Sequence, residues 1–137
     1  MYVLVAGLPG LAHRLEQGRV PLQALQALLD AVPGGVFEGN RVVGRGSVDQ
    51  ALALAATRSD DLGVAVALAG PPTAELDGHP VGGPSQQARM AVAFVREGEV
   101  LVTPAVVDVP EGVGAFDAPA VLSEQVGVPL RFLKDYR

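Results

Sequence analysis

The stretch LGVAVALA from Leu62 to Ala69 decides the fold of this chain. A continuous apolar run of this length, bounded by polar residues, predicts a buried strand in the middle of a sheet. A loop rich in turn residues follows and ends in GHPVGG, from Gly78 to Gly83. Ser85 to Arg96 then has a helical pattern, Gly98 closes it, and Glu99 to Thr103 reads as a second strand. The elements before and after this stretch are assigned relative to its order of strand, loop, helix and strand.

The residues before this stretch predict three helices and two or three strands. Ser47 opens one of the helices, because Gln50 stands three positions later and completes a capping box. The predicted elements are a buried strand over Met1–Ala6, a short helix over Leu11–Gln17, a helix beginning at Pro21, a hairpin or irregular strand over Val36–Gly46, and a helix over Val48–Thr57.

The residues after it predict a short helix, a loop and a terminal hairpin. Proline at the first helical position predicts a helix from Thr103-Pro104 to Asp108. Pro110–Pro119 reads as a loop, and Ala120–Gln125 with Pro129–Leu133 as the two strands of the hairpin. The whole order indicates one α+β domain over residues 1–137. We expect a ferredoxin-like βαββαβ core, a mainly antiparallel sheet, and helices covering one face.

Composition excludes several classes of function. The chain of 137 residues has no cysteine, so thiolate metal sites and cysteine nucleophiles are excluded. Its net charge is −5 and its ten basic residues are scattered, whereas nucleic-acid binding needs a clustered basic face. No apolar run reaches the roughly 18 residues of a spanning helix, and no secretory signal is apparent. We therefore expect a cytoplasmic protein that binds neither nucleic acid nor membrane.

Three segments resemble the catalytic domain of class III adenylate and guanylate cyclases. The first is the strand end Ala6-Gly7, which in the family continues as Ala-Asp. The second is the block from Gly78 to Val107, with its Val-Gly turn, helix and GEVLV strand. The third is Gly127-Val128-Pro129 and the strand after it, near the family's usual end. The resemblance covers nearly the whole chain and implies the cyclase fold.

The same resemblance implies that the metal-binding residues are missing. Family members hold two metal ions with two aspartates, one after the first strand and one in a Gly-Asp hairpin turn. The first position is Gly7 here. The second falls at Gly39-Asn40 or at Gly44-Arg45, according to where a gap is placed. Neither alternative supplies a carboxylate, and Mg²⁺ has little affinity for a site without one.

The family's catalytic helix is also altered. It carries an asparagine that orients the ribose and, four positions later, an arginine that stabilises the transition state. Those positions fall at Gln86 and Met90, with Arg89 one residue from the second. Gly10 lies in the turn after the first strand, where a phosphate could sit on a helix N-terminus; the other interpretation is a plain turn. The positions that the resemblance assigns to nucleotide binding are thus Gly7, Gly10, Asn40, Arg45, Gln86 and Arg89.

The resemblance supports two functions from different classes. The first is a catalytically inactive cyclase-like domain that acts as a dimerisation or regulatory interaction module, without cofactor. Because family members pair, a homodimer is the expected assembly, and a different protein partner stays open. The alternative is a nucleotide-binding protein, or a divergent cyclase that makes a cyclic nucleotide with Mg²⁺ or Mn²⁺ on displaced carboxylates such as Asp49, Asp60 or Asp61. An unrelated ligand near Gly7 and Gly82 is a third possibility.

Overall fold

The computed structural model describes residues 1–77 and 79–137, without the side chain of His79, so Gly78 of the predicted turn lies outside the described residues. Over this range the chain forms five helices and eleven strands. In chain order they are β1 (Tyr2–Gly7), α1 (Leu11–Glu16), α2 (Leu22–Ala31), β2 (Val36–Glu38), β3 (Arg41–Gly46), α3 (Val48–Ala55), β4 (Arg58–Ser59), β5 (Leu62–Gly63), β6 (Ala65–Ala69), β7 (Ala74–Leu76), β8 (His79–Val81), α4 (Gly83–Val92), β9 (Val100–Val102), β10 (Val113–Asp117), α5 (Ala120–Val126) and β11 (Arg131–Asp135).

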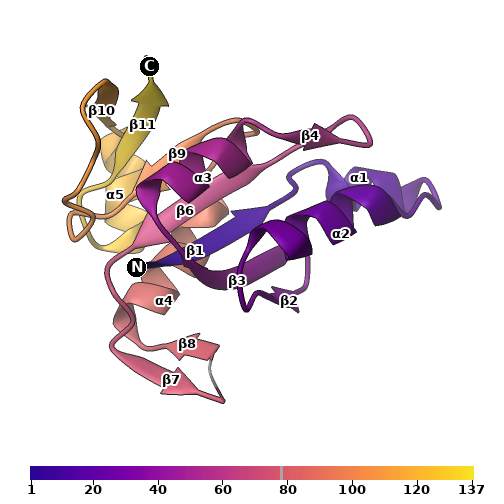
Figure 1. Cartoon of the computed structure of the whole chain (residues 1–137), viewed down its shortest axis with the longest axis horizontal. Coiled ribbons are helices and arrows are strands. Elements are labelled where there is room, and N and C mark those ends of the chain that lie inside the picture. The colour runs from indigo at the N-terminus through magenta and orange to yellow at the C-terminus, as the bar shows by residue number, and fades with distance from the viewer. Residues whose placement is uncertain (78) are drawn as a thin grey trace.

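A seven-stranded sheet forms the centre of the molecule, in the order β10-β11-β9-β6-β1-β3-β2 (Figure 1). Four of its strands, β6-β1-β3-β2, pair with one another in antiparallel orientation. With α1, α2 and α3 between them, they make the βαββαβ core that the sequence predicted. The predicted α+β fold with a mainly antiparallel sheet is therefore confirmed.

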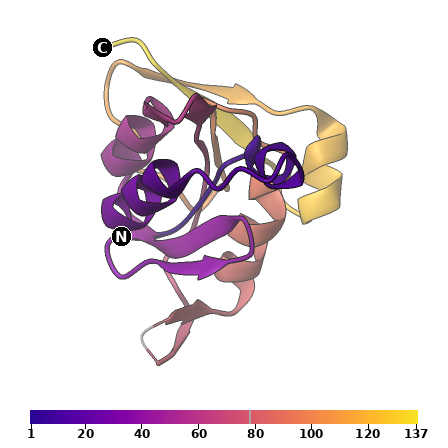
Figure 2. The ribbon, with the colours of Figure 1, turned by 90° about the vertical axis from the view of Figure 1, so that its right-hand side faces the viewer.

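The rest of the sheet is added beyond β6. After β6 the chain makes the β7–β8 hairpin and α4, and then returns as β9, which pairs with β6 in parallel. β11 pairs antiparallel with β9 and with β10, so the last strand in the chain lies inside the sheet. The β7–β8 hairpin projects from the body of the molecule in both views (Figures 1 and 2).

Helices cover both faces of this sheet, which corrects the expectation that they cover one. Alternate residues of β1 point to opposite sides: Leu4 and Ala6 belong to a core with α2 and α3. Val3 and Val5 belong to a second core with α4 and α5. The prediction was right for the helices of the ferredoxin-like core. It failed for α4, because the parallel β6–α4–β9 connection crosses over the other face.

The helices α3 and α2 begin at caps of two kinds, one local and one distant in sequence. Ser47 Oγ accepts from the Gln50 backbone N–H at 3.1 Å, and the Gln50 side chain accepts from the Ser47 backbone N–H at 2.7 Å. The predicted capping box is thus confirmed. The first turn of α2 is capped from a distant hairpin instead. Asp60, between β4 and β5, accepts from the Ala24 backbone N–H at 3.0 Å, a cap that adjacent sequence could not reveal.

Three predictions for the C-terminal part were wrong. Residues 103–108 form no helix, and the Thr103 hydroxyl has no hydrogen-bond partner among the described residues. The predicted loop 110–119 contains β10. The predicted strand 120–125 is helix α5, which ends at Gly127 with φ +90°. The terminal hairpin therefore does not form. Its second strand, β11, pairs with β9 and β10, two partners distant in sequence.

No helix in the described part of the chain combines the length and apolar character needed to cross a membrane.

The predicted long strand over Leu62–Ala69 is interrupted at Val64. β5 pairs with β4, and β6 pairs with β1 and β9. Because β1 and β6 are antiparallel, the end of β1 lies beside the start of β6, and this end of the sheet carries the candidate site.

Candidate functional site

A cavity of about 310 Å³ lies where β1 ends, beside the turn between β2 and β3 and the last turn of α4. Sheet register brings its walls together, because Gly7 is the cross-strand partner of both Arg41 and Ala65. The lining residues are Gly7, Leu8, Pro9, Asn40, Arg41, Ala65, Val92, Ala93 and Val95. Two of the predicted positions, Gly7 and Asn40, are therefore in one cavity although 33 residues separate them in the chain.

The cavity has room for a side chain at Gly7. A Cβ atom built there lies 3.8 Å from the Asn40 carbonyl oxygen and from Val92 Cγ2, and 4.0 Å from Arg41 Cβ. These are ordinary van der Waals distances. Gly7 is therefore not required by packing, and the cavity leaves space for a Cβ atom at this position.

Gly10 does not belong to the cavity. It precedes α1 and does not line the cavity. A Cβ atom there would lie 2.7 Å from Cδ2 at the end of the Leu62 side chain, so a larger residue would require Leu62 to move.

The hairpin turn that faces Gly7 is Gly39-Asn40. Gly39 has φ +65°, the left-handed conformation that glycine adopts at little cost. Arg45 lies five residues after Asn40, on β3 opposite Val3, and its side chain forms an ion pair with Glu75 of the β7–β8 hairpin. Of the two alignments that the sequence left open, the structure places Asn40 at the cavity and Arg45 away from it.

Arg41 is a cavity residue that the sequence analysis missed. Its Nη1 donates to the Arg89 carbonyl oxygen at 3.0 Å, near the C-terminal end of α4. A cation is favourable there because helix C-termini carry partial negative charge. The only sequence signal was its position directly after the turn residue Asn40.

The side chain of Arg89 is directed to Glu38 and not to the cavity. Arg89 Nε lies 2.9 Å from Glu38 Oε2, and Nη2 lies 3.4 Å from Glu38 Oε1. Arg89 Nη2 also donates to the Pro80 carbonyl oxygen at 3.5 Å. This arginine therefore joins α4 to the edge strand β2 and to the β7–β8 hairpin. Gln86, one helical turn earlier, is exposed and does not line the cavity.

The donor groups at the cavity do not fit a divalent cation. Among the residues that the structure describes, none of those lining the cavity carries a carboxylate, and one is a guanidinium. Over the same described residues, no group of three or more His, Asp or Glu side chains converges anywhere. Mg²⁺ and Mn²⁺ are held by oxygen ligands, mainly carboxylates. Arg41 adds positive charge where the ion would have to bind.

The acidic residues considered as substitutes have other roles. Asp60 caps α2, as described above. Asp49 forms an ion pair with Arg137 at 2.8 Å. Asp61 occupies the β4–β5 turn with φ +60°. None of the three is among the described residues that line the cavity.

The fold of the chain matches that of solved catalytic domains of nucleotidyl cyclases. It matches a crystal structure of the adenylyl cyclase CyaB from P. aeruginosa with a TM-score of 0.64 and 14% identity, over 99% of this chain and 94% of that one. The catalytic core of a rhodopsin-guanylyl cyclase with converted specificity, in complex with ATPalphaS, matches with a TM-score of 0.65 and 11% identity, over 99% and 95%.

A third match is the dimeric guanylyl cyclase domain of the RhoGC fusion protein from the aquatic fungus Blastocladiella emersonii, with a TM-score of 0.60 and 8% identity, over 99% and 94%. No protein-family profile and no curated protein matches the chain. The chain thus has the adenylyl and guanylyl cyclase fold over nearly its whole length, as the resemblance in the sequence predicted.

Proposed function

We propose that this chain is a catalytically inactive domain of the cyclase fold that acts as a dimerisation or regulatory interaction module. The observation that carries the proposal is the cavity at the end of β1. Where the resemblance implies two metal-binding aspartates, the cavity is lined by Gly7 and Asn40, with Arg41 beside them. The scaffold around the site is retained, and the ligands that the chemistry needs are not.

The energetic consequence is large. Metal ions in such a reaction activate the attacking hydroxyl and neutralise charge on the phosphates. Their loss removes several kcal/mol of transition-state stabilisation, and about 4 kcal/mol already corresponds to roughly a thousandfold in rate. A single guanidinium can attract a phosphate, but it cannot lower the pKa of an attacking hydroxyl as a bound metal ion does.

The arrangement of α4 supports the same proposal. Arg89, the arginine beside the family's catalytic position, is engaged by Glu38, and its side chain is only 14% exposed. Gln86 stands exposed in place of the ribose-orienting asparagine. Substrate contacts by Arg89 would first require breaking an ion pair within the same chain.

Exposed apolar side chains near one sheet edge support a role in assembly. Val36 and Phe37 are partly exposed on the edge strand β2, and Leu76 of the projecting β7–β8 hairpin is 66% exposed. The two regions are linked through β3, since Arg45 of β3 pairs with Glu75 of β7. We infer a homodimer related by a twofold axis, the commonest symmetry of such assemblies. The structurally similar domain from B. emersonii was crystallised as a non-canonical dimer, and a double mutant of it as a monomer.

Activity and ligand binding are tested on the purified chain. Thermal unfolding is measured with ATP or GTP at millimolar concentration, with Mg²⁺ or Mn²⁺, and the same mixtures are assayed for cyclic nucleotide. We expect no metal-dependent stabilisation and no product. Formation of a cyclic nucleotide would overturn the proposal, because it requires a metal site that these residues do not provide.

Assembly is tested by sedimentation velocity over a range of concentrations. Leu76→Ser should weaken self-association, whereas Val107→Thr, which alters an exposed valine of the 103–112 segment, should leave it unchanged. A chain that stays monomeric at the highest concentration would contradict the homodimer. Equal effects of the two substitutions would contradict the β7–β8 hairpin as its contact surface.

A further inference from the structure

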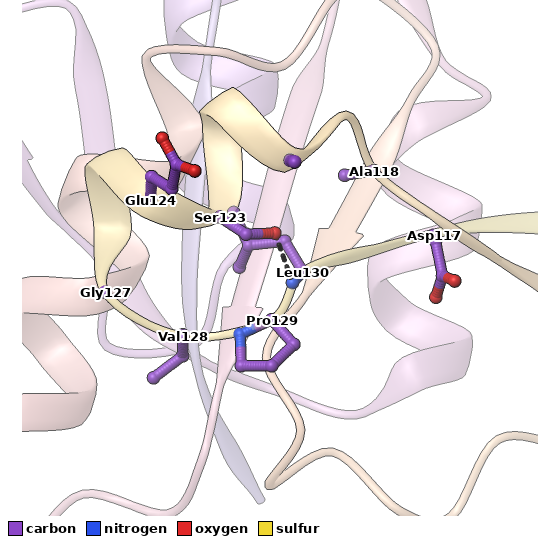
Figure 3. A pocket seen from close by; sticks show the side chains of 9 residues that line it. Asp117, Ala118, Ser123, Glu124, Gly127, Val128, Pro129 and Leu130 are labelled. Carbon is purple, nitrogen blue, oxygen red and sulfur yellow. Dashed lines mark hydrogen bonds between the residues drawn. The ribbon is translucent and has the colours of Figure 1, made fainter.

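A second cavity, of about 560 Å³, lies on α5 and the segment that leads into β11 (Figure 3). It is distinct from the cavity at Gly7, because the two share no residue. Its size is in the range of pockets that bind small molecules or short peptide segments. The lining residues are Asp117, Ala118, Ala120, Ser123, Glu124, Gly127, Val128, Pro129 and Leu130.

The floor of this groove is apolar and fixed by hydrogen bonds. The Leu130 backbone N–H donates to Ser123 Oγ at 3.0 Å, and the Leu130 carbonyl accepts from the Ala118 N–H at 2.9 Å. The Gly127 N–H donates to the Ser123 carbonyl at 2.8 Å. These bonds hold the segment after α5 against the helix, so the groove exists before any ligand arrives. A ligand therefore binds without the cost of ordering this wall.

Two carboxylates flank the apolar floor. Figure 3 shows Glu124 on α5 and Asp117 at the end of β10 on opposite sides of Pro129 and Leu130. Both are exposed, and within the described part of the chain neither has an ion-pair partner within 4.0 Å. Arg131 is the cross-strand partner of Asp117. The two side chains form no ion pair within 4.0 Å.

We propose that this groove binds a short extended peptide segment in which a basic side chain stands next to an apolar one. The apolar residue would pack on Pro129 and Leu130, and the basic residue would pair with Glu124 or Asp117. Charge complementarity selects this partner, since an acidic segment would meet two carboxylates of like sign. The inference rests on the proposed interaction module, for which it names a partner surface and its chemistry.

The experiment uses the whole chain and defined fluorescent pentapeptides with leucine in the middle. One peptide has arginine directly on both sides of the leucine, and two have arginine directly on one side. Matched peptides have glutamine or glutamate at those positions. Binding is measured by fluorescence anisotropy at low and high salt, and the site is mapped by changes in the amide NMR signals. We expect the arginine peptides to bind best, to weaken with salt, and to perturb Ser123, Gly127 and Leu130.

Charge variants test the two carboxylates. Each of Glu124→Gln and Asp117→Asn should weaken binding of the arginine peptides about threefold, as expected for a solvent-exposed ion pair. The double variant should weaken it about tenfold. The control is Glu16→Gln/Glu111→Gln, which changes the net charge equally at two exposed sites outside the groove. Circular dichroism of each variant verifies its folding.

Three results would overturn the inference: no binding of any arginine peptide at millimolar concentration, equal binding of the glutamate peptides, or unchanged affinity in the double variant. These outcomes are separable from failure of the proposed function. If the chain makes no cyclic nucleotide and self-associates but ignores the peptides, only the groove proposal fails. If it makes a cyclic nucleotide, the proposed function fails whatever the peptides do.

Discussion

The ion pair between Arg89 and Glu38 offers the sharpest test of whether Arg89 of α4 serves the structure or a ligand. If Arg89 serves the structure, removing it must cost stability. If it is kept for a ligand, removing it should cost little, because functional residues are commonly retained at the expense of stability. The proposed experiment is a double-mutant cycle with Arg89→Gln, Glu38→Gln and the double variant.

The expected magnitude follows from the burial of the two side chains. Arg89 is 14% exposed and Glu38 is 34% exposed, and two contacts of 2.9 and 3.4 Å join them. The pair therefore lies between exposed ion pairs, worth about 0.2–1 kcal/mol, and buried ones, where loss of one partner costs about 3–5 kcal/mol. We expect each single variant to lose about 2 kcal/mol and the coupling energy to be about 1–1.5 kcal/mol. For a chain of this size, 2 kcal/mol lowers Tm by roughly 6–8 °C.

The assay is urea unfolding followed by circular dichroism, with Tm as a second readout. The cycle isolates the pair because the other contacts of each side chain cancel between its two arms. Arg58 and Glu97 provide the control, since they are 3.0 Å apart but their side chains are 59% and 35% exposed. Their coupling should be below about 0.5 kcal/mol. An Arg89–Glu38 coupling no larger than that of the control pair would refute the structural role.

Three further predictions concern the cavity, a strained turn and the first strand. Gly7→Asp/Asn40→Asp should create a divalent-cation site, so that 10 mM Mn²⁺ stabilises the variant by about 1.4 kcal/mol for a Kd near 1 mM, while the wild type shows no shift in a thermal scan. Asp61→Gly should raise the free energy of unfolding by about 0.5–1 kcal/mol, because Asp61 has φ +60° and glycine relieves that strain; an unchanged urea midpoint would contradict this. A hydrogen bond to Asp108, and then burial, raises the pKa of Tyr2 above its ordinary value near 10. Its contribution to stability is therefore complete below pH 10 and is lost as the pH rises through the raised pKa, so the advantage of wild type over Tyr2→Phe should shrink in urea unfolding between pH 9 and 11.

Sequence reasoning succeeded where the signal was local. The capping box at Ser47 and the buried strand at the N-terminus depend on neighbouring residues only, and both were predicted. β10 was missed because Val113–Asp117 is short and rich in small residues, and its pairing with β11 is what makes it a strand. α5 was read as a strand from its apolar residues. In the structure this segment is a helix, and it ends at Gly127, which has the left-handed conformation.

The candidate site was predicted in part for the same reason. The resemblance pointed to Gly7, which directly follows a recognisable strand, and the structure places Gly7 in the lining of the cavity. The resemblance left Asn40 and Arg45 as alternatives, because the register of a hairpin is set by how its strands pair and not by the sequence of the turn alone. Arg41 carried no motif at all. It became visible once the sheet placed it opposite Gly7, beside the end of α4.

The geometry also explains how the fold can form without two aspartates at this cavity. Gly7 and Asn40 are brought together by backbone pairing of β1 with β3, which does not depend on their side chains. Two aspartates in this cavity would repel each other unless metal ions were bound between them. Glycine and asparagine remove that repulsion, and Arg41, which would compete with a metal ion, instead donates to the end of α4. Under the proposed function, in which this cavity holds no cation, glycine and asparagine should stabilise the domain more than two aspartates would, so stability and the absence of metal binding favour the same residues.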